Sequence, residues 1–287
     1  MFFIKTQKVL FFFILIFFFS IQAFSAEKYD ISTIHAKNLL NNMKHWTIID
    51  ARPKRLWSEV HLPGALTFNW EEYIRKDEFN IPFRLKQPEV IAKALGKFGI
   101  NENSPVVIYG DADTSWGGEG WICWMLVWLG HKGPIRLLNG GITQWVDLKY
   151  PLTGKSLLQQ QEVTSYKYQV REKVNISTIE IIKNPGKYHL IDTRSLLEWY
   201  RGHLPGAVHI SWKKFYKGKN RTPITSKELK KLLLNKGIEL NKPIVYYCTG
   251  GIRSSYSWLI HSIAGLPPAK NYEGGMAAWE KLSVKKY

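Results

Sequence analysis

One cysteine in the C-terminal half of the chain has the sequence context that nucleophilic chemistry requires. Cys248 directly follows the apolar, β-favouring run Ile244–Tyr247 and precedes the segment Thr249–Arg253, TGGIR. Adjacent glycines let the backbone turn successive amide groups toward one point, and a following helix adds the positive end of its dipole. Such a cradle stabilises a thiolate or a bound anion. The stretch therefore predicts a reactive cysteine rather than a buried structural one.

The elements that position Cys248 can be predicted from the same stretch. Ile244–Tyr247 is typical of a strand buried on both faces. Apolar residues recur at helical spacing over Tyr256–Ile263, and Ser254 or Ser255 can cap that helix. Cys248 is therefore expected at the carboxyl end of a strand, where the active sites of parallel α/β sheets gather.

The chain contains a second, modified copy of this region. Ile49–Ala65 (IDARPKRLWSEVHLPGA) matches Ile191–Ala207 (IDTRSLLEWYRGHLPGA), VVIYG matches IVYYC, and NGGITQW matches EGGMAAW. Three matched blocks in the same order indicate a duplicated domain rather than a solenoid. Gly110 occupies the position of Cys248 in the first copy. That copy is predicted to be chemically silent and to shape or cover the site.

Strand-like runs alternate with helical segments in both copies, which predicts an α/β fold with a parallel sheet flanked by helices. The expected strands are Trp46–Asp50, Val106–Tyr109, Ile135–Leu138, His189–Asp192, Ile244–Tyr247 and Lys270–Tyr272. The expected helices are Pro88–Phe98, Trp121–Leu129, Ser226–Lys236 and Tyr256–Ile263. The polar stretch Pro151–Ser165 is typical of a surface linker. The boundary is placed near Gln160, between predicted domains at residues 27–155 and 165–287.

The first residues have the composition of a targeting segment. Lys5 and Lys8 precede the apolar run Val9–Phe19, and small residues near Ser25 fit a cleavage site. The sequence therefore predicts a signal peptide over residues 1–26 and export to a periplasm-like compartment, without stable membrane association after cleavage. The apolar run is short for a spanning helix. An uncleaved N-terminal membrane anchor is the alternative.

Composition limits the other possible functions. The formal net charge is +17, yet the lysines are scattered rather than clustered with aromatic residues, so no nucleic-acid partner is expected. The two cysteines, Cys123 and Cys248, could pair in an oxidising compartment. Because Cys123 lies in an apolar stretch that predicts a core helix, free thiols are favoured. Asp111 and Asp113 alone are weak grounds for a metal site.

The blocks IDTR…EWYRGHLPGA, VYYCTGG-R and NYEGGMAAW resemble the three signatures of the rhodanese (sulfurtransferase) family. The resemblance covers nearly the whole mature chain as a tandem, two-domain member. It implies a five-stranded parallel sheet with flanking helices in each domain and a site at the interdomain cleft, with only the C-terminal domain catalytic. It implies that Cys248 carries sulfane sulfur as a persulfide, without a metal or an organic cofactor. The loop residues around that sulfur are Thr249, Gly250, Gly251, Ile252 and Arg253.

Two further charged positions, together with Arg253 of the loop, belong to the expected site. Asp192 and Arg194 are assigned to substrate binding beside the loop, but Asp50 and Arg52 repeat them in the silent copy and favour a structural role. Arg253 can close the loop by binding its carbonyls or a carboxylate, or it can attract an anionic donor.

The resemblance implies a small anionic sulfur donor and a thiol or cyanide acceptor. In family members of the thiosulfate type, the loop that begins with the cysteine resembles Cys-Arg-Lys-Gly-Val-Thr. Members of the mercaptopyruvate type carry a further arginine at the position where this chain has Glu198. Thiosulfate is the default donor. A non-catalytic exported module that binds sulfane sulfur or senses redox state is the alternative. A cysteine-loop phosphatase is disfavoured because such loops resemble Cys-x5-Arg, one residue longer than the loop here. No oligomeric state is predicted.

Overall fold

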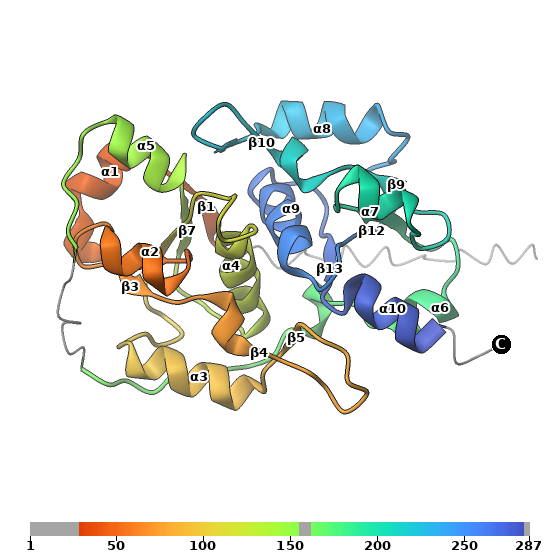
Figure 1. Cartoon of the computed structure of the whole chain (residues 1–287), viewed down its shortest axis with the longest axis horizontal. Helices are drawn as coiled ribbons and strands as arrows, with labels where there is room; N and C mark the ends of the chain where they lie inside the picture. The colour runs from red at the N-terminus through yellow and green to blue at the C-terminus, as the bar shows by residue number, and fades with distance from the viewer. Residues whose placement is uncertain (1–28, 155–161, 284–287) are drawn as a thin grey trace, which may run out of the picture.

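The computed structural model describes residues 29–154 and 162–283, which form two α/β domains side by side (Figure 1). The predicted signal peptide over residues 1–26 and the predicted boundary near Gln160 lie outside the described residues. Within the two described ranges, no helix combines the length and apolar character needed to cross a membrane.

The N-terminal domain is built on a parallel sheet. Its strands, in spatial order, are β1 (Ile31–Ile34), β7 (Ile135–Leu138), β6 (Val106–Tyr109), β2 (Thr47–Asp50) and β3 (Leu66–Thr67). Its helices are α1 (Ala36–Asn41), α2 (Lys54–Glu59), α3 (Pro88–Lys97), α4 (Gly118–Trp128) and α5 (Gly141–Asp147). Short 3-10 turns cover Met43–His45 and Trp70–Tyr73.

The C-terminal domain repeats this arrangement. Its sheet has the spatial order β13 (Lys270–Tyr272), β12 (Ile244–Tyr247), β8 (His189–Asp192) and β9 (Val208–His209), all parallel. Its helices are α6 (Thr178–Lys183), α7 (Leu196–Tyr200), α8 (Ser226–Leu234), α9 (Ile252–Ile263) and α10 (Gly275–Ser283). Short 3-10 turns cover Glu172–Val174 and Trp212–Phe215.

The predicted class, two domains with parallel sheets flanked by helices, is confirmed. The number of strands differs between the domains: the first sheet has five, and the second has four in the described part of the chain. The position of a fifth strand is taken by Asn175, which pairs with Asn271 only as an isolated parallel bridge. A 3-10 turn ends at Val174 and α6 begins at Thr178, so too few extended residues remain for a strand.

The helix after Cys248 begins earlier than predicted. Gly251 is its N-cap, in the left-handed conformation with φ +84°, and the first helical residue is Ile252. A helical turn therefore already contains Ser254 and Ser255, and the predicted serine cap is wrong. The glycine can replace a side-chain cap because it turns the chain sharply from strand to helix without a steric penalty.

The two domains pack through the helices that follow equivalent strands. Helices α4 and α9 lie against each other at the centre of the molecule (Figure 1). Gly120 permits this approach, since a Cβ atom there would lie 2.3 Å from the Cα atom of Tyr256. Buried residues of α4 and α9 belong to one continuous hydrophobic cluster. Burial of apolar surface between the domains thus fixes their relative position.

Each domain also extends a hairpin toward the other. In the N-terminal domain, β4 (Ile74–Arg75) pairs with β5 (Arg84–Leu85), and the loop between them places Ile81 in the apolar cluster of the C-terminal domain. In the C-terminal domain, β10 (Tyr216–Lys217) pairs with β11 (Thr222–Pro223). The exchange is reciprocal, so each loop that follows a central strand is covered by the opposite domain.

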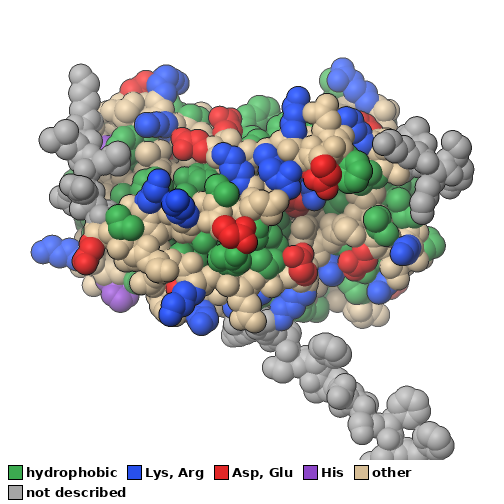
Figure 2. All heavy atoms as spheres, turned by 90° about the horizontal axis from the view of Figure 1, so that it is seen from below, with side chains coloured by type: hydrophobic (Ala, Val, Ile, Leu, Met, Phe, Trp, Pro, Cys, Tyr) green, Lys and Arg blue, Asp and Glu red, His purple; other side chains and the backbone are tan. Residues whose placement is uncertain are grey.

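The charge distribution agrees with a solvated basic surface. Figure 2 shows Lys and Arg side chains dispersed over one face, with acidic and apolar side chains between them. Several of the basic groups are paired with acids, as in the exposed Arg55–Glu59 contact on α2.

Candidate active site

Cys248 lies immediately after β12, at its carboxyl end, and only 1% of the residue is exposed. The Cys248 carbonyl accepts a hydrogen bond from the Met276 amide at 2.8 Å, and the Thr249 carbonyl accepts one from the Ala277 amide at 3.0 Å. Both donors belong to the first turn of α10. The first two carbonyls of the loop are therefore bound by a neighbouring helix.

The amide groups of the loop are left for a different acceptor. Across residues 29–154 and 162–283, the amides of Thr249, Gly250 and Gly251 have no hydrogen-bond acceptor. Gly251 approaches the backbone of Glu273 so closely that a Cβ atom would lie 2.8 Å from it. Free amides at a helix N-terminus stabilise negative charge. The predicted amide cradle is thus present around Cys248.

Arg253 forms an ion pair that closes the edge of the loop. Its guanidinium donates to both carboxylate oxygens of Glu198, each at 2.7 Å, and to the Thr249 hydroxyl oxygen at 2.8 Å. Thr249 in turn donates to Glu198 at 3.0 Å. Of the two roles expected for Arg253, carboxylate binding is the one observed, and the carboxylate belongs to the protein itself.

Burial and pairing act in opposite directions on both charged groups. Burial favours a lower pKa for Arg253, but the hydrogen bonds to Glu198 and to the Cys248 side chain, together with the charges of both groups, outweigh it and raise the pKa. Burial favours a higher pKa for Glu198, but hydrogen bonds from Arg253 and Ser195 hold the pKa well below its usual range. Both groups therefore stay charged at neutral pH.

Glu198 was not predicted as a site residue. Ser195 and Glu198 form a capping box at the start of α7, which fixes the carboxylate at the edge of the loop. The one signal in the sequence was that Glu198 stands at the position where the mercaptopyruvate type carries an arginine. That signal excluded one mode of substrate binding, but it did not identify the partner of Glu198.

Asp192 and Arg194 make a contact that the N-terminal domain reproduces. Arg194 donates to the Asp192 carboxylate at 2.7 Å and to the Gly202 carbonyl at 2.5 Å. Arg52 makes the equivalent bonds to Asp50 and to the Val60 carbonyl. These bonds tie the ends of α2 and α7 to their sheets. Substrate contact by Asp192 and Arg194 stays a prediction.

The N-terminal domain covers the loop. Phe83, at the end of the β4–β5 connection, packs on Gly250, and Arg84 pairs with Glu273 at 2.9 Å. Trp116 lies beside the Arg253 guanidinium, with 5.9 Å from the guanidinium carbon to the ring centroid. Residues of both domains therefore surround Cys248 and its loop.

The N-terminal domain retains the backbone of the site, with Gly110 at the position of Cys248. The Ile142 amide at the start of α5 donates to the Gly110 carbonyl at 3.1 Å, as Met276 does to Cys248. A Cβ atom on Gly110 would lie 2.4 Å from a carboxyl oxygen of Glu119. The space of a cysteine side chain is thus occupied by a carboxyl group, whose pKa burial raises to about 7.

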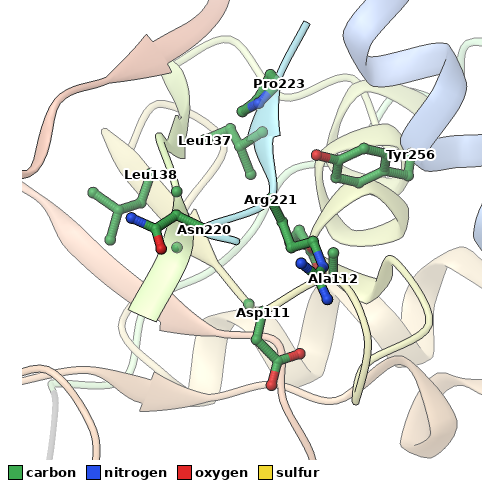
Figure 3. Close-up of a pocket in the computed structure, with 12 residues that line it drawn as sticks. Asp111, Ala112, Leu137, Leu138, Asn220, Arg221, Pro223 and Tyr256 are labelled. Carbon is green, nitrogen blue, oxygen red and sulfur yellow. The ribbon is translucent and has the colours of Figure 1, made fainter. Parts of the chain in front are cut away.

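A small cavity lies at this equivalent position of the N-terminal domain (Figure 3). Asp111 and Arg221 lie on its wall, and Tyr256 of α9 closes another side. Asp113 is paired with Arg221 through the reciprocal hairpin. The two aspartates considered as metal ligands thus face a cation from the other domain, and no group of three or more metal-ligating residues occurs in the described ranges.

Both cysteines are free, as favoured by the sequence. Cys123 is fully buried in α4, and burial raises the pKa of its thiol well above the usual value. A buried, neutral thiol is chemically inert. Cys248 is therefore the cysteine with a nucleophile's surroundings.

Comparison with known proteins defines the family. A rhodanese-like domain model matches residues 35–148 and again 178–282. The chain therefore belongs to the rhodanese family, with two tandem domains.

Relatives within the family include named sulfur-transfer proteins. The chain is 31% identical to the sulfur carrier protein TtuD of Thermus thermophilus, over 79% of this chain and 85% of the relative. It is 27% identical to the thiosulfate sulfurtransferase of Gallus gallus, over 83% of this chain and 84% of the relative. The fold is similar to that of the 3-mercaptopyruvate sulfurtransferase SseA of Escherichia coli, with a TM-score of 0.74 and 21% identity, covering 85% of this chain and 98% of that one.

Proposed function

We propose that this protein is a sulfurtransferase that carries a sulfane sulfur on Cys248. The observation that carries the proposal is the set of unbonded loop amides around a nucleophile present in one domain only. The similarity to thiosulfate and 3-mercaptopyruvate sulfurtransferases supports the same reaction class.

The proposed reaction is a double displacement. The Cys248 thiolate attacks the outer sulfur of thiosulfate, an S–S bond forms, and sulfite leaves with the electron pair of the broken S–S bond. Cyanide or a thiolate then attacks the outer sulfur of the persulfide, and the electron pair of that S–S bond returns to Cys248. The amides of Thr249, Gly250 and Gly251 stabilise the negative charge on the transferred sulfur.

Thiosulfate is the proposed default donor, and the loop amides, rather than loop cations, would bind it. Glu198 already neutralises Arg253, and Thr249 and Gly250 stand where the thiosulfate type has cations. A small dianion can use the amides and the basic surface field. The proposed setting is the exported compartment that the first 26 residues indicate.

Cyanolysis tests this proposal directly. Purified protein is incubated with thiosulfate and cyanide, and thiocyanate is measured with time. Cys248→Ser is expected to abolish turnover. The matched control Cys123→Ser removes the other thiol, distant from the loop in sequence and buried in α4, and is expected to retain turnover. Equal turnover by the wild type and Cys248→Ser contradicts the assignment.

A further inference from the structure

Two buried polar side chains lie beside Cys248 on the side of α9. Ser254 is in the first turn of α9, Asn271 is in the middle of β13, and neither is exposed. The Ser254 hydroxyl oxygen lies 3.7 Å from the Cys248 sulfur and donates a hydrogen bond to the Asn271 side-chain carbonyl at 2.6 Å. The three side chains form a continuous polar chain inside an apolar domain.

The orientation of the Asn271 amide is fixed by the loop itself. Its Nδ2 group donates to the Gly251 carbonyl at 3.2 Å. The reversed amide would place two carbonyl oxygens against each other, so Oδ1 must face Ser254. Asn271 therefore holds both the loop backbone and the serine hydroxyl.

The silent domain shows what the same fold contains without a nucleophile. Gly117 and Gly251 are equivalent, since each is a left-handed N-cap of the helix after the central strand. Counting from these glycines, Gly120 takes the position of Ser254. The position equivalent to Ser254 thus carries no hydroxyl, and the hydroxyl nearest to Gly110 is that of Ser115, 3.1 Å from where a Cβ atom on Gly110 would lie.

The strand position changes in the same way. Leu137 of β7 takes the position of Asn271 of β13, since each precedes the tight turn into the last helix of its domain. A buried polar side chain costs free energy unless it is hydrogen-bonded. The chain of Cys248, Ser254 and Asn271 is therefore not repeated at Gly110, where a different buried pair, Ser115 and Glu119, lies instead.

The hydroxyl of Ser254 has one proton and two possible acceptors. It can donate to Asn271 Oδ1 or to the Cys248 sulfur, but not fully to both. When the sulfur is neutral, the carbonyl is the better acceptor. When the sulfur is a thiolate, a charge-assisted bond to it becomes stronger than the neutral one.

We propose that the Ser254 hydroxyl, oriented by Asn271, donates a hydrogen bond to the Cys248 sulfur whenever that sulfur carries negative charge, and so promotes discharge of the persulfide. This inference rests on the proposed sulfurtransferase function. During discharge the acceptor forms a bond to the outer sulfur, the S–S bond breaks, and its electron pair goes to the Cys248 sulfur. No proton leaves Ser254, whose O–H bond only rotates toward the new charge. Ser254 is a catalytic residue in this scheme, and Asn271 is a positioning residue.

Single-turnover discharge tests the inference. Protein is charged with thiosulfate, freed of excess donor, and mixed with cyanide, and thiocyanate release is timed. Ser254→Ala is expected to slow discharge about tenfold, the effect of losing one hydrogen bond to a charged group. In the same variant, the pH profile of Cys248 alkylation by iodoacetamide is expected to shift to higher pH. Asn271→Leu, which introduces the residue of the silent domain, is expected to slow discharge less, because the hydroxyl remains.

Ser255→Ala is the matched control. Ser255 is equally buried on the same helix, and its hydroxyl donates to the Ile252 carbonyl at 2.6 Å rather than to sulfur. Its discharge rate is expected to match the wild type. Ser254→Thr keeps a hydroxyl and is expected to restore most of the rate, which separates loss of the donor from misfolding.

The outcomes separate this inference from the proposed function. If the wild type forms no persulfide with any sulfane donor, the proposed function is wrong. If the wild type turns over and Ser254→Ala discharges at the wild-type rate with an unchanged alkylation profile, the role of Ser254 is wrong while the function stands. Equal slowing by Ser254→Ala and Ser255→Ala would indicate packing rather than hydrogen bonding to sulfur, and would also overturn it.

Discussion

The ion pair between Glu198 and Arg253 gives a quantitative prediction. Glu198→Gln preserves shape and the capping box but removes the negative charge. The Arg253 side chain is 11% exposed and that of Glu198 is 30% exposed, so the pair lies between a surface and a buried ion pair. Surface pairs contribute up to about 1 kcal/mol, and breaking a buried pair costs roughly 3–5 kcal/mol. The variant is expected to lose about 2 kcal/mol of unfolding free energy at neutral pH.

The pH dependence of this loss follows from the lowered pKa of Glu198. A carboxyl group whose pKa is lower in the folded state stabilises the fold above its unfolded pKa, about 4.3, and loses that contribution as the pH falls toward the folded value. The stability difference between the wild type and Glu198→Gln should therefore be full at pH 7 and shrink as the pH falls below about 4. Urea unfolding followed by tryptophan fluorescence measures it.

An exposed pair supplies the control for this experiment. Arg55 and Glu59 have side chains 73% and 54% exposed, so Glu59→Gln should change stability by less than about 1 kcal/mol. In the assay of turnover, Glu198→Gln should also lower the KM for thiosulfate, because the freed guanidinium attracts the dianion. If Glu198→Gln is no less stable than Glu59→Gln at neutral pH, or if its deficit is unchanged at acid pH, the reasoning about this pair fails.

Two further predictions concern the glycines of the two loops. Gly250→Ala should cost about 1–3 kcal/mol of stability and slow turnover, since its Cβ atom would lie 2.4 Å from that of Phe83. The double variant with Phe83→Gly should regain part of the stability and of the turnover. A strictly additive double-mutant cycle in urea unfolding would contradict the contact. Gly110→Cys should gain no thiosulfate-dependent persulfide on the new thiol, because the Glu119 carboxyl fills that space. Mass spectrometry that detects an added sulfur on the peptide with this substitution would contradict the prediction.

The central strands could be predicted from the sequence because their apolar runs are buried on both faces. Val106–Tyr109 and Ile244–Tyr247 form strands with the predicted bounds, and every residue in them is buried. Cys248 follows the second of them, so its place at the carboxyl end of a strand could also be predicted. The duplication added the comparison with Gly110, which no composition argument could supply.

Contacts between distant segments could not be predicted. Glu198 meets Arg253 across a gap of many residues, and its local pattern indicates only a helix cap. The cover by Phe83 depends on a hairpin with a positive φ of +64°, for which phenylalanine gives no signal. Serine favours a cap position, which predicts a cap at Ser254, whereas Gly251 takes that position here. In each case the tertiary packing decides between local alternatives.

The N-terminal domain has a structural role that these contacts define. It supplies Phe83 over Gly250, Arg84 to Glu273 and Trp116 beside Arg253. The C-terminal domain returns the contact through Arg221, which pairs with Asp113 of the N-terminal domain. Loss of the nucleophile from one copy therefore leaves a domain that still shapes the site of the other.

Mass spectrometry of the Cys248 peptide tests the central claim most directly. Protein incubated with thiosulfate and rapidly alkylated should carry one additional sulfur atom on that peptide and none on the Cys123 peptide. Addition of cyanide should remove the sulfur and yield thiocyanate in equal amount. A Cys248 peptide that stays unmodified with thiosulfate and other sulfane donors would contradict the account.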